Sequence, residues 1–147
     1  MNVLVYTDGS YQDHKSGYAA IYVLSQEPII EYGALPTKWN SNQKAELYAI
    51  YQALLTLRDA RIYTCTLRTD SQYAINCLTI WVANWLKNGW KTANKKPVEN
   101  RELIQLILQL LQIVKVNFEY TPGHSGEKYN ELADKWAKLG TKKFNCQ

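Results

Sequence analysis

The sequence has few cysteines, only two histidines and no long apolar run. Its three cysteines (Cys65, Cys77 and Cys146) are far apart and odd in number, so they form neither a disulfide framework nor a zinc-ligand pattern. No apolar stretch is long enough to span a membrane. The first expected strand begins directly after Met1, which leaves no room for a signal or transit peptide. We therefore expect a cytoplasmic protein that does not bind membranes.

Acidic residues are absent from one segment, between Asp70 and Glu99. Four of the 17 basic residues lie in it, and the other 13 equal the 13 acidic residues, so this segment accounts for the net charge of +4. These four are Lys87, Lys91, Lys95 and Lys96. Such a basic patch predicts a polyanionic partner.

Three tryptophans lie among these lysines, at positions 81, 85 and 90. Trp81 and Trp85 are four residues apart and therefore share one face of a helix. Exposed aromatic rings can stack on bases and sugars, while lysines hold phosphates. The alternative is that the tryptophans belong to a satellite core, and we expect at least one of the three to do so.

The order of the expected elements indicates an α/β fold. Hydrophobic periodicity and turn residues predict strands over 3–7, 18–24, 29–33, 63–69 and 114–120, and helices over 42–58, 72–78, 81–87, 100–112 and 129–140. Three strands followed by alternating helices and strands predict a mixed sheet with helices packed on its faces. The 147 residues are expected to form a single domain, 1–147.

Two of these strands are expected to end at an aspartate followed by turn-forming residues, Asp8 and Asp70. If the strands are neighbours, the two carboxylates face one cleft, where they would share a proton or a cation. Alternatively, each aspartate simply begins a turn.

Two further carboxylates occupy unusual positions. Glu46 lies in the first turn of a helix, on the same face as the apolar Ile50, Ala53 and Leu57. Asp134 lies near the start of the last helix. Both could merely favour a helix N-terminus, but a charge on a core stripe needs a partner or a metal. A set of oxygen ligands suits Mg²⁺ or Mn²⁺ and not Zn²⁺.

The loop over 121–126 holds His124 between two glycines. A histidine on an exposed loop can transfer protons near neutral pH. It could equally be an ordinary loop residue.

Taken together, the motifs resemble ribonuclease HI, the type 1 RNase H family. The resemblance covers nearly the whole chain, in order, and the segment over about 81–97 resembles the basic protrusion, or handle, of that family. The matching motifs are Thr7-Asp8-Gly9-Ser10, Asn42-Gln43-Lys44-Ala45-Glu46, Thr69-Asp70-Ser71 and Gly123-His124-Ser125-Gly126 with Asn130-Glu131 and Asp134.

This resemblance implies a ribonuclease H-like fold, with a five-stranded mixed sheet and helices on both faces. It implies an endonuclease that cuts the RNA strand of RNA–DNA hybrids with two divalent ions, leaving 5′-phosphate and 3′-hydroxyl ends. The sequence does not fix the oligomeric state, and a monomer is the default expectation. The implied metal is Mg²⁺ or Mn²⁺, and the implied ligands are Asp8, Glu46, Asp70 and Asp134. His124 would assist proton transfer and product release, and Glu131 would attract metal or aid release.

The resemblance also assigns residues to the substrate. Asn42 and Gln43 would read 2′-hydroxyls, the groups that distinguish RNA from DNA. The DNA strand would be held by a phosphate pocket and by the handle, through Ser41, Asn100, Trp81, Trp85, Lys87, Lys95 and Lys96.

The chain departs from the family pattern at His14, where asparagine is common, and at Trp39, where some members have arginine. An N-terminal hybrid-binding domain is not expected.

Two alternatives use the same fold. One is a non-catalytic module that binds hybrids or duplexes, which the four carboxylates and His124 oppose. The other is a related DNA nuclease, which Asn42, Gln43 and the handle oppose.

Overall fold

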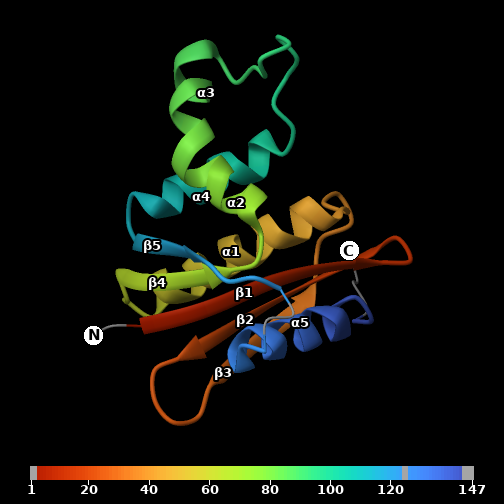
Figure 1. Cartoon of the computed structure of the whole chain (residues 1–147), viewed down its shortest axis with the longest axis vertical. Helices are drawn as coiled ribbons and strands as arrows, with labels where there is room; N and C mark the ends of the chain where they lie inside the picture. The colour runs from red at the N-terminus through yellow and green to blue at the C-terminus, as the bar shows by residue number, and fades with distance from the viewer. Residues whose placement is uncertain (1–2, 124–125, 144–147) are drawn as a thin grey trace.

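The computed structural model describes residues 3–123 and 126–143 and contains a five-stranded mixed sheet in the order β3-β2-β1-β4-β5 (Figure 1). β1 pairs antiparallel with β2 and parallel with β4, β2 pairs antiparallel with β3, and β4 pairs parallel with β5. The mixed sheet expected from the sequence is therefore confirmed. The strands are β1 (Val3–Gln12), β2 (Lys15–Val23), β3 (Ile29–Ala34), β4 (Thr64–Thr69) and β5 (Lys115–Tyr120).

Helices cover both faces of this sheet, as expected (Figure 1). The first helix, α1, packs against β1 and β2 on one face, and α4 packs on the outside of α1. The last helix, α5, packs against β1, β2 and β3 on the other face. None of the helices in the described part of the chain is long and apolar enough to cross a membrane. The helices are α1 (Asn42–Asp59), α2 (Gln72–Asn76), η1 (Cys77–Trp81), α3 (Val82–Asn88), α4 (Arg101–Leu111) and α5 (Lys128–Gly140).

The main core lies between the sheet, α1 and α4. The predicted apolar stripe of α1 is buried there, including Ile50 and Ala53. A smaller cluster, formed by Tyr6, Ile21 and Ala133, lies between the sheet and α5. Glu46 therefore belongs to a helix whose neighbouring face is apolar and buried.

Strand β1 is longer than predicted, so the expectation that it ends at Asp8 was wrong. It continues to Gln12 because its second half pairs with β2, up to a two-residue turn at Asp13 and His14. Both turn residues have positive φ, 52° and 63°, as the tight turn of a hairpin requires. The parallel pairing of β1 with β4, however, ends at Thr7 and Thr69.

Because Thr7 and Thr69 are partners, the next residues of the two strands, Asp8 and Asp70, lie side by side. The prediction that the two aspartates are neighbours is thus correct, although the predicted end of β1 is wrong.

The handle is built on a continuous helical rod and not on two separate helices. The chain passes from α2 into α3 through η1, a single wide π-helical turn. The rod ends at Gly89, which has a φ of 77°. The loop that follows is closed by pairing of Lys91 with Pro97, and α3 and this loop project away from the sheet (Figure 1).

Candidate active site

Three carboxylates from separate elements gather at the centre of the sheet. Asp8 comes from the middle of β1, Glu46 from the first turns of α1, and Asp70 from the residue after β4. Carboxylate oxygens of the three residues lie within 4.8 Å of one another. Carboxylates at this separation need protons or a cation between them.

Gly9 fixes the position of Glu46 on the sheet. Its backbone N–H donates hydrogen bonds to Oε1 of Glu46, at 2.7 Å, and to Oδ1 of Asp8, at 2.9 Å. A Cβ atom at position 9 would lie 2.3 Å from the carbonyl carbon of Ala45. Only glycine therefore lets the start of α1 lie directly on β1, which brings Glu46 to Asp8.

Asp70 is held at the junction between β4 and α2. The next residue, Ser71, caps α2 by accepting a hydrogen bond from Ala74 N–H at 3.1 Å, and its own N–H donates to Thr69 Oγ1. Oδ1 of Asp70 is buried and has no hydrogen-bond partner among the described residues. A buried, unpartnered carboxylate oxygen beside two other carboxylates fits a divalent cation.

Burial and mutual repulsion make the cluster hard to ionise. Burial raises the pKa of Asp8 to about 8, with further contributions from the charges of Asp70 and Asp134, while a hydrogen bond with Glu46 opposes the shift. Burial likewise raises the pKa of Glu46 well above its usual range, together with the charges of Asp8 and Asp70. The cluster will therefore hold protons at neutral pH unless a cation replaces them.

Asp134 lies at the edge of this cluster. It is close enough to Asp8 for its charge and a hydrogen bond to raise the pKa of Asp8. Its own carboxylate forms an ion pair with Lys138, one helical turn along α5, at 3.0 Å. It is not among the three residues whose oxygens gather within 4.8 Å. The ion pair uses Oδ2 alone, so Asp134 could offer its second carboxylate oxygen as a ligand while it keeps the pair.

Two candidate residues remain, Glu131 and His124. Glu131 lies in the first turn of α5 and is exposed. His124 lies outside the described residues, so its role stays a prediction.

Asn42 and Gln43 are exposed at the start of α1, the helix that carries Glu46. Ser41 caps this helix by accepting a hydrogen bond from Lys44 N–H at 3.0 Å. Asn42 and Gln43, which are proposed to contact 2′-hydroxyls, are therefore fixed within one helical turn of Glu46.

A polar network connects the start of α1 with the root of the handle. Asn100 accepts a hydrogen bond from Lys44 Nζ, at 2.7 Å, and donates to Tyr73 OH, at 2.8 Å, and to Gln43 Oε1, at 3.3 Å. Asn100 has a φ of 64°, which asparagine tolerates. The sequence reasoning missed Lys44 and Tyr73, because no local pattern connects three distant segments.

Aromatic rings run from this network along the handle. The ring centroids are 6.0 Å apart for Tyr73 and Trp81, 6.0 Å for Trp81 and Trp85, and 5.7 Å for Trp85 and Trp90. Trp90 is buried, which confirms that at least one of the three tryptophans is a core residue, whereas Trp81 is 38% exposed.

A hollow of about 600 Å³ opens beside Trp81 and Trp85, and Lys87 and Lys91 line it. Lys95 and Lys96 are exposed in the loop that follows.

The two unusual residues come from different segments: His14 lies in the turn between β1 and β2, and Trp39 lies just before α1. The His14 ring Nδ1 is 3.2 Å from Tyr11 OH, and the His14 carbonyl accepts a hydrogen bond from Asn40. Trp39 is buried against Tyr48, with the ring centroids 5.6 Å apart.

A mixed sheet of this order, with carboxylates from β1, α1 and β4 at its centre, defines the ribonuclease H-like class. The chain belongs to the RNase H family, whose family model matches residues 1–142. This confirms the resemblance seen in the motifs.

Individual relatives agree with this assignment. A ribonuclease H of Alcanivorax borkumensis is 37% identical over 141 residues, covering 95% of this chain and 91% of that protein. A ribonuclease H of Haemophilus influenzae is 36% identical over 139 residues, covering 92% and 87%. The solved structure of LC9-RNase H1, a type 1 RNase H with the type 2 active-site motif, has a TM-score of 0.78 at 22% identity, covers 95% of this chain and 72% of that one, and shows the shared fold.

Proposed function

We propose that this protein is an endonuclease that hydrolyses the RNA strand of RNA–DNA hybrids, leaving 5′-phosphate and 3′-hydroxyl ends. The observation that carries the proposal is the carboxylate cluster of Asp8, Glu46 and Asp70, with its unpartnered buried oxygen, in a chain of the RNase H family. A non-catalytic binding module would gain nothing from gathering three mutually repelling carboxylates, one of them buried and two partly buried.

Asp8, Glu46 and Asp70 would hold divalent ions, two when substrate is bound, and Asp134 would complete the set. The proposed metal is Mg²⁺, with Mn²⁺ as a substitute, because the donors are all carboxylate oxygens. When bound, such ions supply an activated water and stabilise charge on the leaving oxygen. The Gly9 N–H keeps Glu46 oriented toward Asp8 throughout.

Substrate selection is assigned to the residues around this cluster. Asn42 and Gln43 would donate to or accept from 2′-hydroxyls, the only groups that distinguish an RNA sugar from a DNA sugar. Ser41 and Asn100 would hold a DNA phosphate near the root of the handle. The proposed grip on the rest of the DNA strand comes from Trp81, Trp85, Lys87, Lys95 and Lys96.

Proton transfer and product release are assigned to residues of α5 and of the loop before it. His124 would transfer a proton and assist product release, and Glu131 would aid release. We further propose a monomer as the active unit and the cytoplasm as its location.

Cleavage of matched labelled duplexes tests this function. With Mg²⁺ we expect cutting of the RNA strand in an RNA–DNA hybrid, and at most trace cutting of double-stranded RNA and double-stranded DNA of the same sequence. The ends are checked by ligation and by phosphatase treatment. Efficient cutting of duplex DNA would favour the related DNA nuclease, and tight hybrid binding without any cutting would favour the binding module.

The raised pKa values predict an unusual pH dependence of stability for the metal-free protein. A carboxyl group whose pKa is higher in the folded than in the unfolded state stabilises the fold most below its unfolded pKa of about 4. That contribution is lost as the pH rises through the folded pKa, about 8 for Asp8. In EDTA, the free energy of unfolding contributed by the cluster should therefore fall between pH 5 and 8.

The measurement is thermal or urea unfolding across this pH range, for the unmodified chain and for Asp8→Asn. The difference between the two isolates the cluster from other titrating groups. Mg²⁺ binds the ionised carboxylates, so the stabilisation that it gives should grow from pH 6 to 8. A difference that stays constant with pH would contradict the proposed proton uptake.

A further inference from the structure

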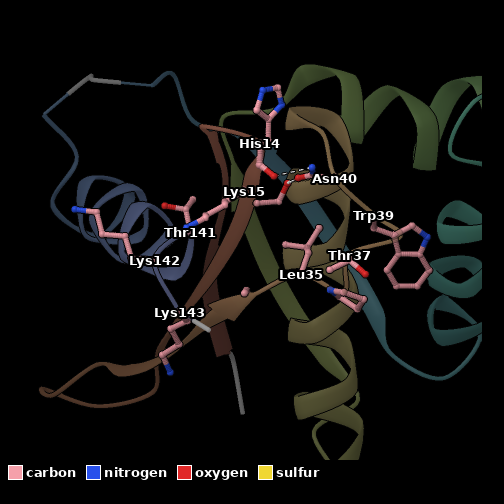
Figure 2. Close-up of a pocket in the computed structure, with 12 residues that line it drawn as sticks. His14, Lys15, Leu35, Thr37, Trp39, Asn40, Thr141, Lys142 and Lys143 are labelled. Carbon is pink, nitrogen blue, oxygen red and sulfur yellow. Dashed lines mark hydrogen bonds between the residues drawn. The ribbon is translucent and has the colours of Figure 1, made fainter. Parts of the chain in front are cut away.

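A second pocket of about 330 Å³ lies at the end of the sheet, lined by β2, β3, the segment before α1 and the end of α5 (Figure 2). Leu35 lies in the middle of the lining residues, with Trp39 on one side and Thr141 on the other. His14 and Asn40 lie together at one end, joined through the His14 carbonyl. The walls are thus apolar along Leu35 and Trp39, and polar around the rim.

The charge around this pocket is of one sign. Lys15, Lys142 and Lys143 line it, and no carboxylate of the described residues does. Lys143 is engaged, with its ammonium 4.0 Å from the centre of the Tyr32 ring. Lys15 and Lys142 form none of the ion pairs found among the described residues. An anion that enters the pocket would therefore bind Lys15 and Lys142 without breaking any of these ion pairs.

Close packing sets the far wall of the pocket. A Cβ atom at Gly140 would lie 2.4 Å from the carbonyl oxygen of Gly33, so the end of α5 lies directly on the sheet. Thr141 follows at once and is buried, and its hydroxyl donates to the Lys138 carbonyl at 2.7 Å. Lys142 is therefore presented from a fixed helix end.

We propose that this pocket binds one nucleotide unit, with its phosphate at Lys15 and Lys142 and its base or sugar against Leu35 and Trp39. Cations beside an apolar aromatic wall match the two halves of a nucleotide. Trp39 and Asn40 line the pocket and directly precede Ser41, the first of the proposed substrate residues, so the pocket adjoins the proposed substrate site. The proposal therefore rests on the proposed function if the unit belongs to a strand, and stands alone if it is a free nucleotide.

The test follows the indole ¹⁵N–H resonance of Trp39 in the full chain carrying Asp70→Asn, which is expected to prevent cleavage of the probe. Trp39→Phe assigns the resonance. The probes are free dAMP, a blunt RNA–DNA hybrid, and the same hybrid with a single-stranded overhang. We expect a saturable shift with dAMP, with the overhanging hybrid, or with both, and the responding probe identifies the source of the nucleotide. The proposal would be wrong if neither dAMP nor the overhanging hybrid shifted the resonance. It would also be wrong if the blunt and overhanging hybrids gave equal shifts and dAMP gave none.

Matched double variants separate the pocket from net charge. Lys15→Gln with Lys142→Gln should raise the Kd of the responding probe about fivefold or more, because two charge-assisted contacts are lost. Arg61→Gln with Lys115→Gln also removes two positive charges, at the opposite end of the sheet, and should change the Kd less than about twofold. If both double variants raised the Kd equally, the effect would come from net charge, and the proposed phosphate contacts would be wrong. Whether the unmodified chain cuts hybrids is measured separately, so failure of either proposal is recognised independently.

Discussion

Asp70→Asn is expected to reduce Mg²⁺-dependent cleavage by about 10³-fold or more while the protein still binds the hybrid. The substitution keeps the size of the side chain but removes the charge of a carboxylate with an unpartnered buried oxygen. Losing a preorganised electrostatic group typically costs a catalyst at least about 10²-fold to 10³-fold. Single-turnover cleavage and hybrid affinity in EDTA are the two measurements.

The same variant has a second readout that does not depend on activity. The charge of Asp70 raises the pKa values of Asp8 and Glu46, so its removal should stabilise the metal-free protein at pH 7 to 8. Asp59→Asn makes the same chemical change at an exposed site at the far end of α1 and should alter neither property. Undiminished cleavage by Asp70→Asn would rule out Asp70 as a metal ligand.

Gly9→Ala is expected to damage both the fold and the active site. The new Cβ would lie 2.3 Å from the Ala45 carbonyl carbon and 2.4 Å from the Glu46 nitrogen, which are backbone atoms that cannot rotate away. Helix α1 must then move off β1, at a cost of about 3 kcal/mol in the free energy of unfolding. The move also pulls Glu46 from the Gly9 N–H, and a shift of about 1 Å can cost about 10²-fold in rate.

Urea unfolding and cleavage rates at saturating Mg²⁺ measure the two effects. Gly33→Ala is the matched control, because its Cβ would approach only the side chain of Tyr18, at 3.2 Å, which can shift. We expect Gly33→Ala to lose less than about 1 kcal/mol. If Gly9→Ala were as stable and as active as the control, close packing of α1 on β1 would not be what positions Glu46.

The sequence predicted the sheet and most of the helices because their apolar periods are regular and their ends carry turn residues. The position of Asp8 shows the limit of such reasoning. Gly9 and Ser10 resemble a turn locally, but pairing with β2 extends the strand through them to Gln12. Pairing between distant segments decides that outcome, and a single segment does not record it.

The functional site likewise has features that single segments predict and features that depend on contacts between distant segments. The proximity of Asp8, Glu46 and Asp70 was predicted from two strand ends and from one charged residue on an apolar helix stripe. The ion pair of Asp134 with Lys138 was also within reach, since the two residues are four apart on a predicted helix. The contacts of Asn100 with Lys44 and Tyr73 were not, because they join three segments through side chains alone.

The helical rod that starts two residues after Asp70 connects the carboxylate cluster with the tip of the handle. Seventeen residues of helix, from Gln72 to Asn88, span roughly 25 Å. Ala74, Cys77 and Leu78 anchor the first half of this rod in the core, so a tilt can occur only beyond them. A tilt of about 5° in the outer half, roughly 12 Å long, would move the far end by about 1 Å while Asp70 stays almost still. Movement of the handle tip would thus leave the distances between the carboxylates unchanged. Mobility at the tip and rigidity at the carboxylate cluster are thereby divided between opposite ends of one helical rod.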